Sequence, residues 1–136
     1  MLEQDFGPSA DPELAKLTAE QGEPGWWCCR TCQHRIARSD AGISFDGSHQ
    51  HRFANPHGFE FAVYLFSEAP GLRPRGQPTD HFSWFVGYTW QIGYCANCAT
   101  HIGWAFEVLG SPGVGEPHLF YALITARVEL EVKRDD

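Results

Sequence analysis

The spacing of apolar residues predicts that most of this chain forms short β-strands. Segments 59–66 and 102–108 alternate apolar with other positions, which is typical of a strand with one buried face. The residues on the two apolar faces are Phe59, Phe61, Val63 and Leu65, and Ile102, Trp104, Phe106 and Val108. Segments 88–92 and 119–124 are rich in aromatic and β-branched residues and favour strands as well.

Clusters of Gly and Pro predict the turns between these segments. They stand at residues 55–58, 69–71, 73–76 and 110–115. Short strands joined by frequent turns are typical of an all-β fold. Residues 1–25 are polar and acidic instead, so we expect a flexible N-terminal leader there.

Length and charge narrow the classes of protein to consider. The 136 residues fit one compact domain, and the formal net charge is −7. Six acidic residues lie in the first 25, so the rest is close to neutral and has no cationic surface for nucleic acid. No run approaches the roughly 18 apolar residues of a membrane span, and the first residues are acidic, unlike a secretory signal. We therefore expect a soluble, cytoplasmic protein that binds neither nucleic acid nor membranes.

Two C-x-x-C motifs predict one structural zinc ion. We call the turn at Cys29–Cys32 the first knuckle and the turn at Cys95–Cys98 the second knuckle. Such a turn directs two thiolates at one metal, and two turns supply a tetrahedron of soft ligands. Disulfides are disfavoured because the cysteine count is odd and the context is reducing. Four cysteines close the metal shell, so the zinc would be structural rather than catalytic.

Three more residues near the knuckles have open roles. Cys28 is either packed inertly or a reactive thiol, and reactivity requires an electropositive, exposed setting. His34 and His101 could substitute as metal ligands, although the four cysteines already suffice.

Aromatic residues make up 14% of the chain and include five Trp, more than a routine core needs. Trp84 and Trp90 flank a turn at Gly87, and Trp104 and Phe106 share one face of a predicted strand. Composition leaves two interpretations open: these rings are core, or they form the walls of a small binding site for a flat ring or a cation.

Four strings of residues together carry a family resemblance. They are Cys28-Cys29-Arg30-Thr31-Cys32-Gln33, then Asn55-Pro56-His57-Gly58, then residues 83–90, and finally residues 95–104. Their order and internal spacing resemble the ligand-binding domain family of cereblon, also called the CULT domain, in its stand-alone, bacterial-type form. The resemblance covers residues 26–126, which implies a cereblon-like domain there and a C-terminal tail over residues 127–136.

The resemblance implies a β-tent, in which two antiparallel sheets are pinned by the four-cysteine zinc site. It also implies a cage of Trp84, Trp90 and Trp104 for cyclic imides: glutarimide, thalidomide-type ligands, C-terminal cyclic imides of proteins and uracil-like rings. The backbone carbonyl of Phe82 would accept from the imide, and the backbone N–H of Trp84 would donate to it. The ligand-binding residues implied are Asn55, Pro56, Phe82, Ser83, Trp84, Trp90, Trp104 and Phe106.

The chain also departs from the family pattern. Phe82 stands where cereblon has His, so one side-chain hydrogen bond to a ligand is lost, and Val86 replaces a Pro. The adaptor-binding and Lon-like regions of full-length cereblon have no counterpart in 136 residues. We therefore expect no ubiquitin-ligase adaptor as a partner.

The leading hypothesis is a binding module without enzymatic activity. One alternative is an enzyme similar to zinc-bearing methionine sulfoxide reductases, which would need Cys28 as an activated thiolate. Another is a reader of quaternary ammonium groups, such as methyl-lysine or a betaine, for which Asp80 is the only obvious acidic partner.

Overall fold

The computed structural model describes residues 25–131, and this part of the chain is all-β. Two short 3₁₀-helices, η2 over Ser39–Ala41 and η3 over Thr125–Arg127, are its only helical elements. No helix in the described part could cross a membrane. The strands are β1 (Trp26–Cys29), β2 (Arg35–Arg38), β3 (Gln50–Ala54), β4 (Glu60–Phe66), β5 (Leu72–Thr79), β6 (Tyr88–Cys95), β7 (His101–Val108), β8 (Leu119–Ile124) and β9 (Val128–Leu130).

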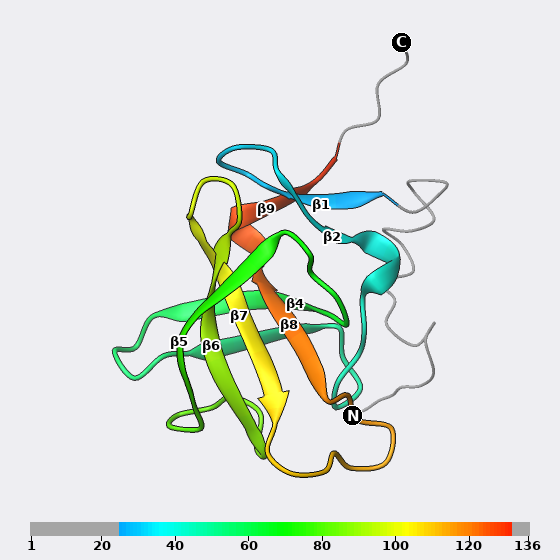
Figure 1. Cartoon of the computed structure of the whole chain (residues 1–136), viewed down its shortest axis with the longest axis vertical. Coiled ribbons are helices and arrows are strands. Elements are labelled where there is room, and N and C mark those ends of the chain that lie inside the picture. The colour runs from blue at the N-terminus through cyan, green and yellow to red at the C-terminus, as the bar shows by residue number, and fades with distance from the viewer. Residues whose placement is uncertain (1–24, 132–136) are drawn as a thin grey trace.

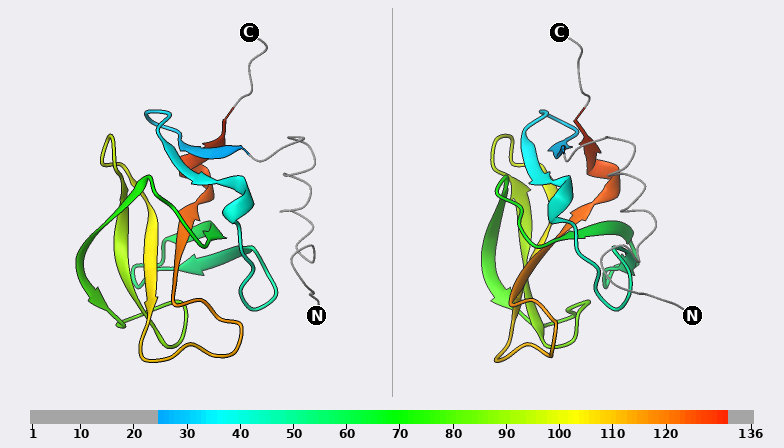
Figure 2. Two further views of the ribbon diagram at one scale, coloured as in Figure 1. Left: turned by 45° about the vertical axis from the view of Figure 1, so that its right-hand side comes forward. Right: turned by 90° about the vertical axis from the view of Figure 1, so that its right-hand side faces the viewer.

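The strands form two antiparallel sheets, as expected for a β-tent (Figure 1). The small sheet has the order β2-β1-β9, and the large sheet has the order β3-β4-β8-β7-β6-β5. The large sheet is strongly curved, so that β3 and β4 run across the direction of β5 to β7 (Figure 2). The small sheet lies beside the end of the large sheet where β6 turns into β7.

Most of the predicted strands are confirmed. Segment 119–124 is β8, segment 102–108 lies within β7, and segment 88–92 is the first part of β6. Strand β4 begins at Glu60, however, so Phe59 is outside it and 67% exposed rather than part of an apolar face.

The predicted turn at residues 73–76 is wrong, because these residues belong to β5. This strand contains Pro74 and Pro78 and lies at the edge of the large sheet. A proline lacks the N–H that a central strand needs, but an edge strand tolerates it. The Gly and Pro content of this segment therefore marks an edge strand instead of a turn.

Two groups of buried side chains stabilise the fold. One lies between the sheets and includes Ile36, Phe66 and Leu123. The other lies within the curve of the large sheet and is mostly aromatic, with Phe85, Phe106 and Phe120 in mutual contact. The fold thus has a metal-knuckle end and an aromatic end.

The predicted leader, apart from Gly25, and residues 132–136 of the predicted tail lie outside the described residues. The division of the chain at residue 126 stays a prediction. Strand β9, which follows that position, pairs along β1 from Trp27 to Cys29.

Candidate metal centre and aromatic pocket

The four cysteines of the two knuckles come together, with all four sulfur atoms within 4.8 Å of one another. The closest pairs are Cys29 with Cys98 at 3.7 Å and Cys32 with Cys95 at 3.6 Å between sulfurs. Four thiolates about 2.3 Å from a tetrahedral metal lie about 3.8 Å apart, so this arrangement fits one ion. Because Cys29 ends β1 and Cys95 ends β6, the metal centre joins the small sheet to the large one.

The two knuckles have the same backbone geometry. In each, the first cysteine donates its N–H to the carbonyl five residues later, at 2.8 Å in both cases. The residue after the second cysteine donates to the carbonyl of the first, at 2.7 and 2.9 Å. That residue is Gln33 in the first knuckle and Ala99 in the second, and both adopt a left-handed conformation with φ of 68° and 64°.

The protein environment spreads the pKa values of the cysteine thiols. A hydrogen bond from the Thr100 hydroxyl, 3.0 Å from the Cys98 sulfur, is the main reason that the pKa of Cys98 is lowered to about 6. Burial raises the pKa of Cys95 to about 12 and also raises the pKa of Cys29. Metal binding must therefore displace protons from the buried thiols, and Cys98 gives up its proton more readily than they do.

Cys28 does not join this cluster of sulfurs. Its side chain is only 2% exposed, and burial raises the pKa of its thiol to about 11. A reactive cysteine needs an accessible thiolate, so this setting fits inert packing. His34 and His101 also lie outside the cluster.

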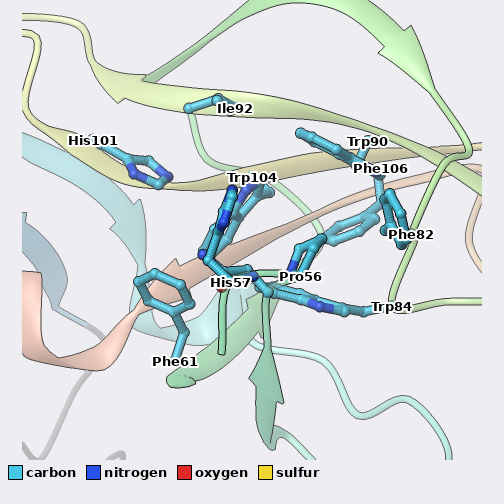
Figure 3. A pocket seen from close by; sticks show the side chains of 11 residues that line it. Pro56, His57, Phe61, Phe82, Trp84, Trp90, Ile92, His101, Trp104 and Phe106 are labelled. Carbon is cyan, nitrogen blue, oxygen red and sulfur yellow. Dashed lines mark hydrogen bonds between the residues drawn. The ribbon is translucent and has the colours of Figure 1, made fainter. Parts of the chain in front are cut away.

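At the aromatic end, side chains from β4, β6, β7 and two loops enclose a pocket of about 520 Å³ (Figure 3). The loops are the β3–β4 connection and the segment that precedes β6. The lining residues are Asn55, Pro56, His57, Phe61, Phe82, Trp84, Trp90, Ile92, His101, Trp104 and Phe106. This described set contains no Asp, Glu, Lys or Arg, so its character is aromatic and nearly uncharged.

Three indoles define the shape of the pocket. The rings of Trp84 and Trp104 meet edge to face, with centroids 4.6 Å apart and planes at 71°. Hydrogen bonds to backbone carbonyls fix the orientations of Trp84 and Trp90. The Nε1 of Trp84 donates to Ala54 at 3.2 Å, and the Nε1 of Trp90 donates to His81 at 2.7 Å. Their indole N–H groups are thus used by the protein, and the ring surfaces are left to form walls.

Seven of the eight residues expected to bind ligand line this pocket: Asn55, Pro56, Phe82, Trp84, Trp90, Trp104 and Phe106. Ser83 is outside the lining set, and its hydroxyl donates to the backbone carbonyl of Phe85 at 3.0 Å. Its contacts therefore stabilise the loop before β6.

Sequence reasoning missed four lining residues: His57, Phe61, Ile92 and His101. One signal could have found Ile92, since it follows Trp90 by two positions and faces Trp104 across β6 and β7. The ring of His101 packs edge-on against the ring of Trp104, with centroids 4.9 Å apart. Its Nε2 donates to the Gly103 carbonyl at 3.1 Å. Burial, and secondly the charge of Arg127, lower the pKa of His101, which favours the neutral form of its ring.

Comparison with curated proteins finds relatives that share one name, Protein cereblon. The chain is 34% identical over 127 residues to the protein from Drosophila erecta, which covers 90% of this chain and 21% of that protein. It is 36% identical over 107 residues to the protein from Drosophila pseudoobscura pseudoobscura, covering 75% and 17%. It is 34% identical over 85 residues to the protein from Danio rerio, covering 60% and 20%. The chain spans about a fifth of the length of these relatives, and no family model matches it.

The comparison corrects one expectation from the sequence. We expected no ubiquitin-ligase adaptor as a partner because the chain resembles a single domain of cereblon. That expectation is wrong, because the relatives are named Protein cereblon and this chain matches only about a fifth of their length. The length of one domain does not exclude the partners of the protein to which such a domain belongs.

Proposed function

This chain is a cereblon-like domain, and on that premise we propose that it binds cyclic imides in its aromatic pocket without transforming them. The ligand class includes glutarimide, thalidomide-type compounds, cyclised C-termini of proteins and uracil-like rings. All the described lining residues fall between Asn55 and Phe106, so this one domain supplies the whole described lining.

The observation that carries this proposal is a neutral aromatic cage beside unused backbone groups. Indole faces suit flat rings, and the edges of such a ring need polar partners. Among the described residues, neither the backbone carbonyl of Phe82 nor the backbone N–H of Trp84 has a hydrogen-bond partner. An imide presents the complementary pair, an N–H flanked by carbonyls.

We assign the four-cysteine centre to a structural zinc ion. Thiolate ligands in a tetrahedron are typical of zinc, and four of them leave no position for water or substrate. The proposed metal then supports the fold, and the pocket alone supplies binding.

The two alternative functions fit the pocket less well. A quaternary ammonium group would gain from a nearby carboxylate, but Asp80 does not line the pocket. A sulfoxide reductase would need Cys28 as an exposed thiolate, and its side chain is buried.

Calorimetric titration of the zinc-loaded protein with glutarimide tests the proposal. We expect saturable binding that N-methylglutarimide cannot reproduce, since it lacks the imide N–H. Trp84→Ala should lose most of the affinity. Trp26→Ala is the matched control, because Trp26 packs against Arg35 and Arg38 outside the pocket. Equal affinity of both variants, or tighter binding of tetramethylammonium than of glutarimide, would overturn the imide assignment.

A further inference from the structure

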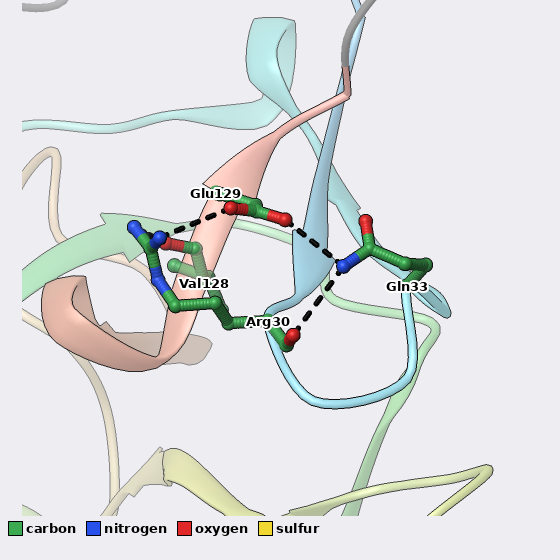
Figure 4. A network of polar contacts seen from close by, with 4 residues as sticks. All are labelled: Arg30, Gln33, Val128 and Glu129. Atoms are coloured by element: carbon green, nitrogen blue, oxygen red, sulfur yellow. Dashed lines mark hydrogen bonds and ion pairs between the residues drawn. The ribbon is translucent and has the colours of Figure 1, made fainter.

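The carboxylate of Glu129, on β9, connects two residues of the first knuckle (Figure 4). Its Oε1 accepts from the Arg30 guanidinium at 3.0 Å, and its Oε2 accepts from the Gln33 side-chain amide at 2.9 Å. Arg30 lies between the two cysteines of the first knuckle, and Gln33 follows the second one. The Glu129 side chain thus contacts one residue within the first knuckle and the residue directly after it.

Further hydrogen bonds join the same residues. The Arg30 guanidinium also donates to the carbonyl of Val128 at 3.3 Å, and the Gln33 amide donates to the carbonyl of Arg30 at 3.3 Å. The backbone N–H of Arg30 donates to the carbonyl of Arg127 at 3.0 Å. The first knuckle is therefore attached to β9 through side chains and through its backbone.

The left-handed conformation of Gln33 depends on its surroundings, to which this attachment belongs. A residue other than Gly is strained at a positive φ and keeps it only when its surroundings enforce it. At the equivalent position of the second knuckle, Ala99 has no polar side chain, and the hydroxyl of Thr100 contacts the metal-ligand sulfur of Cys98 directly. The two knuckles share one backbone geometry but are supported in different ways.

We propose that Glu129 is a positioning residue of the metal centre, which holds the first knuckle in its metal-binding conformation through Arg30 and Gln33. This inference rests on the proposed zinc ion. Residues that orient metal ligands typically contribute 10- to 100-fold to metal affinity, although they do not touch the metal.

Glu131, the residue directly after β9, provides a matched control. Its carboxylate makes a two-pronged pair with Arg35 at 3.0 and 3.1 Å, away from the knuckle. The side chains of Glu129 and Glu131 are 34% and 38% exposed, so they are similarly solvated. Exposed ion pairs contribute little to the free energy of unfolding. Loss of either ion pair should by itself cost similarly little stability, and only loss of the Glu129 pairs should change metal retention.

The test measures the rate at which zinc leaves the loaded protein for an excess of a chromogenic chelator. We expect Glu129→Gln to release zinc about tenfold faster than wild type, and Glu131→Gln to release it at the wild-type rate. Equal rates for the two variants would overturn the proposal. If the wild-type protein binds no zinc, the metal assignment fails instead, so the two failures are distinguishable.

A second variant tests whether Glu129 acts on the first knuckle through Gln33. Glycine adopts a positive φ without strain, so Gln33→Gly removes the need to hold this residue. In the Gln33→Gly background, Glu129→Gln should accelerate zinc release less than it does in the wild-type background. The same acceleration in both backgrounds would contradict positioning through Gln33.

Discussion

The metal end and the aromatic end of this domain are built in opposite ways. The metal end takes its four ligands from two turns, each four residues long, at the ends of β1 and β6. The pocket takes its walls from three strands and two loops, and its shape depends on the register that places Ile92 opposite Trp104 and Trp90 opposite Phe106. A local motif thus specifies the first site, whereas long-range strand pairing specifies the second.

The two ends also contribute differently to the molecule. Four thiolates on one metal ion would link the two sheets, so we expect this end to govern stability. The pocket exposes aromatic faces that the fold does not fully use, so this end should govern binding. Substitutions at Cys95, Trp104, Phe82 and His101 should separate these contributions.

Replacement of one metal ligand should have the largest effect. Structural zinc contributes about 10–16 kcal/mol in apparent free energy, comparable with the whole stability of a small domain. We expect Cys95→Ser to lose zinc and to show no cooperative thermal unfolding by circular dichroism. Cys28→Ser is the control, because Cys28 is the same residue type, is equally buried and is not in the cluster. A folded, metal-free Cys95→Ser protein would show that the sheets hold together without the ion.

Trp104 is the point where core and pocket meet, since it lines the pocket and is only 7% exposed. Trp104→Ala should lower the free energy of unfolding by about 3–5 kcal/mol, as truncation of a buried aromatic does. It should also abolish detectable glutarimide binding while zinc stays bound in a one-to-one ratio. Urea unfolding, calorimetry and metal analysis measure the three quantities. Loss of zinc from this variant would mean that the two ends are not separable.

Phe82 offers a change that affects binding alone. Its side chain is 71% exposed at the pocket, so it contributes little to the core. Phe82→His restores the side-chain donor implied by the family resemblance. One hydrogen bond of about 0.5–1.5 kcal/mol corresponds to a roughly two- to tenfold gain in glutarimide affinity. Unfolding and zinc content should be unchanged; weaker binding by Phe82→His would contradict this placement of the ligand.

The smallest expected effect concerns the pH dependence that His101 confers. Its pKa is lowered in the folded protein, mainly by burial, so the unfolded chain takes up the proton first as the pH falls. Stability from this group is therefore full above about pH 6.5, the unfolded value, and declines as the pH falls below it. His101→Gln keeps an amide donor for the Gly103 carbonyl but cannot titrate. Urea unfolding between pH 7 and pH 5 should show a smaller loss of stability for His101→Gln than for wild type. An identical loss would contradict the lowered pKa.

The sequence predicts the two ends with unequal success. The metal cluster follows from cysteine spacing, because a C-x-x-C turn fixes the direction of both thiols whatever lies between the turns. The prediction of Trp84, Trp90 and Trp104 as cage residues rests on a family resemblance, since composition alone does not distinguish core from cage. Phe61 and His101 were missed because tertiary contacts, not local spacing, bring them to the pocket, whereas His57 directly follows the predicted Pro56.

Strand prediction failed at residues 73–76 and at Phe59. Gly76 and the prolines of β5 have the composition of a turn, but the edge of a sheet tolerates them. Phe59 continues the apolar alternation of β4, yet it belongs to the loop from Asn55, whose side-chain oxygen accepts from the Phe59 N–H at 3.0 Å. The first error depends on the position of β5 at the sheet edge, and the second on a local hydrogen bond in the β3–β4 loop.

We propose that Trp84, Trp90 and Trp104 form a cage for a cyclic imide at the aromatic end of the domain. Two-dimensional NMR of the zinc-loaded protein resolves the indole N–H signals of all five Trp during a glutarimide titration. We predict that the signals of these three residues shift together and saturate, while those of Trp26 and Trp27, in β1, stay in place. Unshifted cage signals at saturating glutarimide, or equal shifts of all five, would contradict the claim.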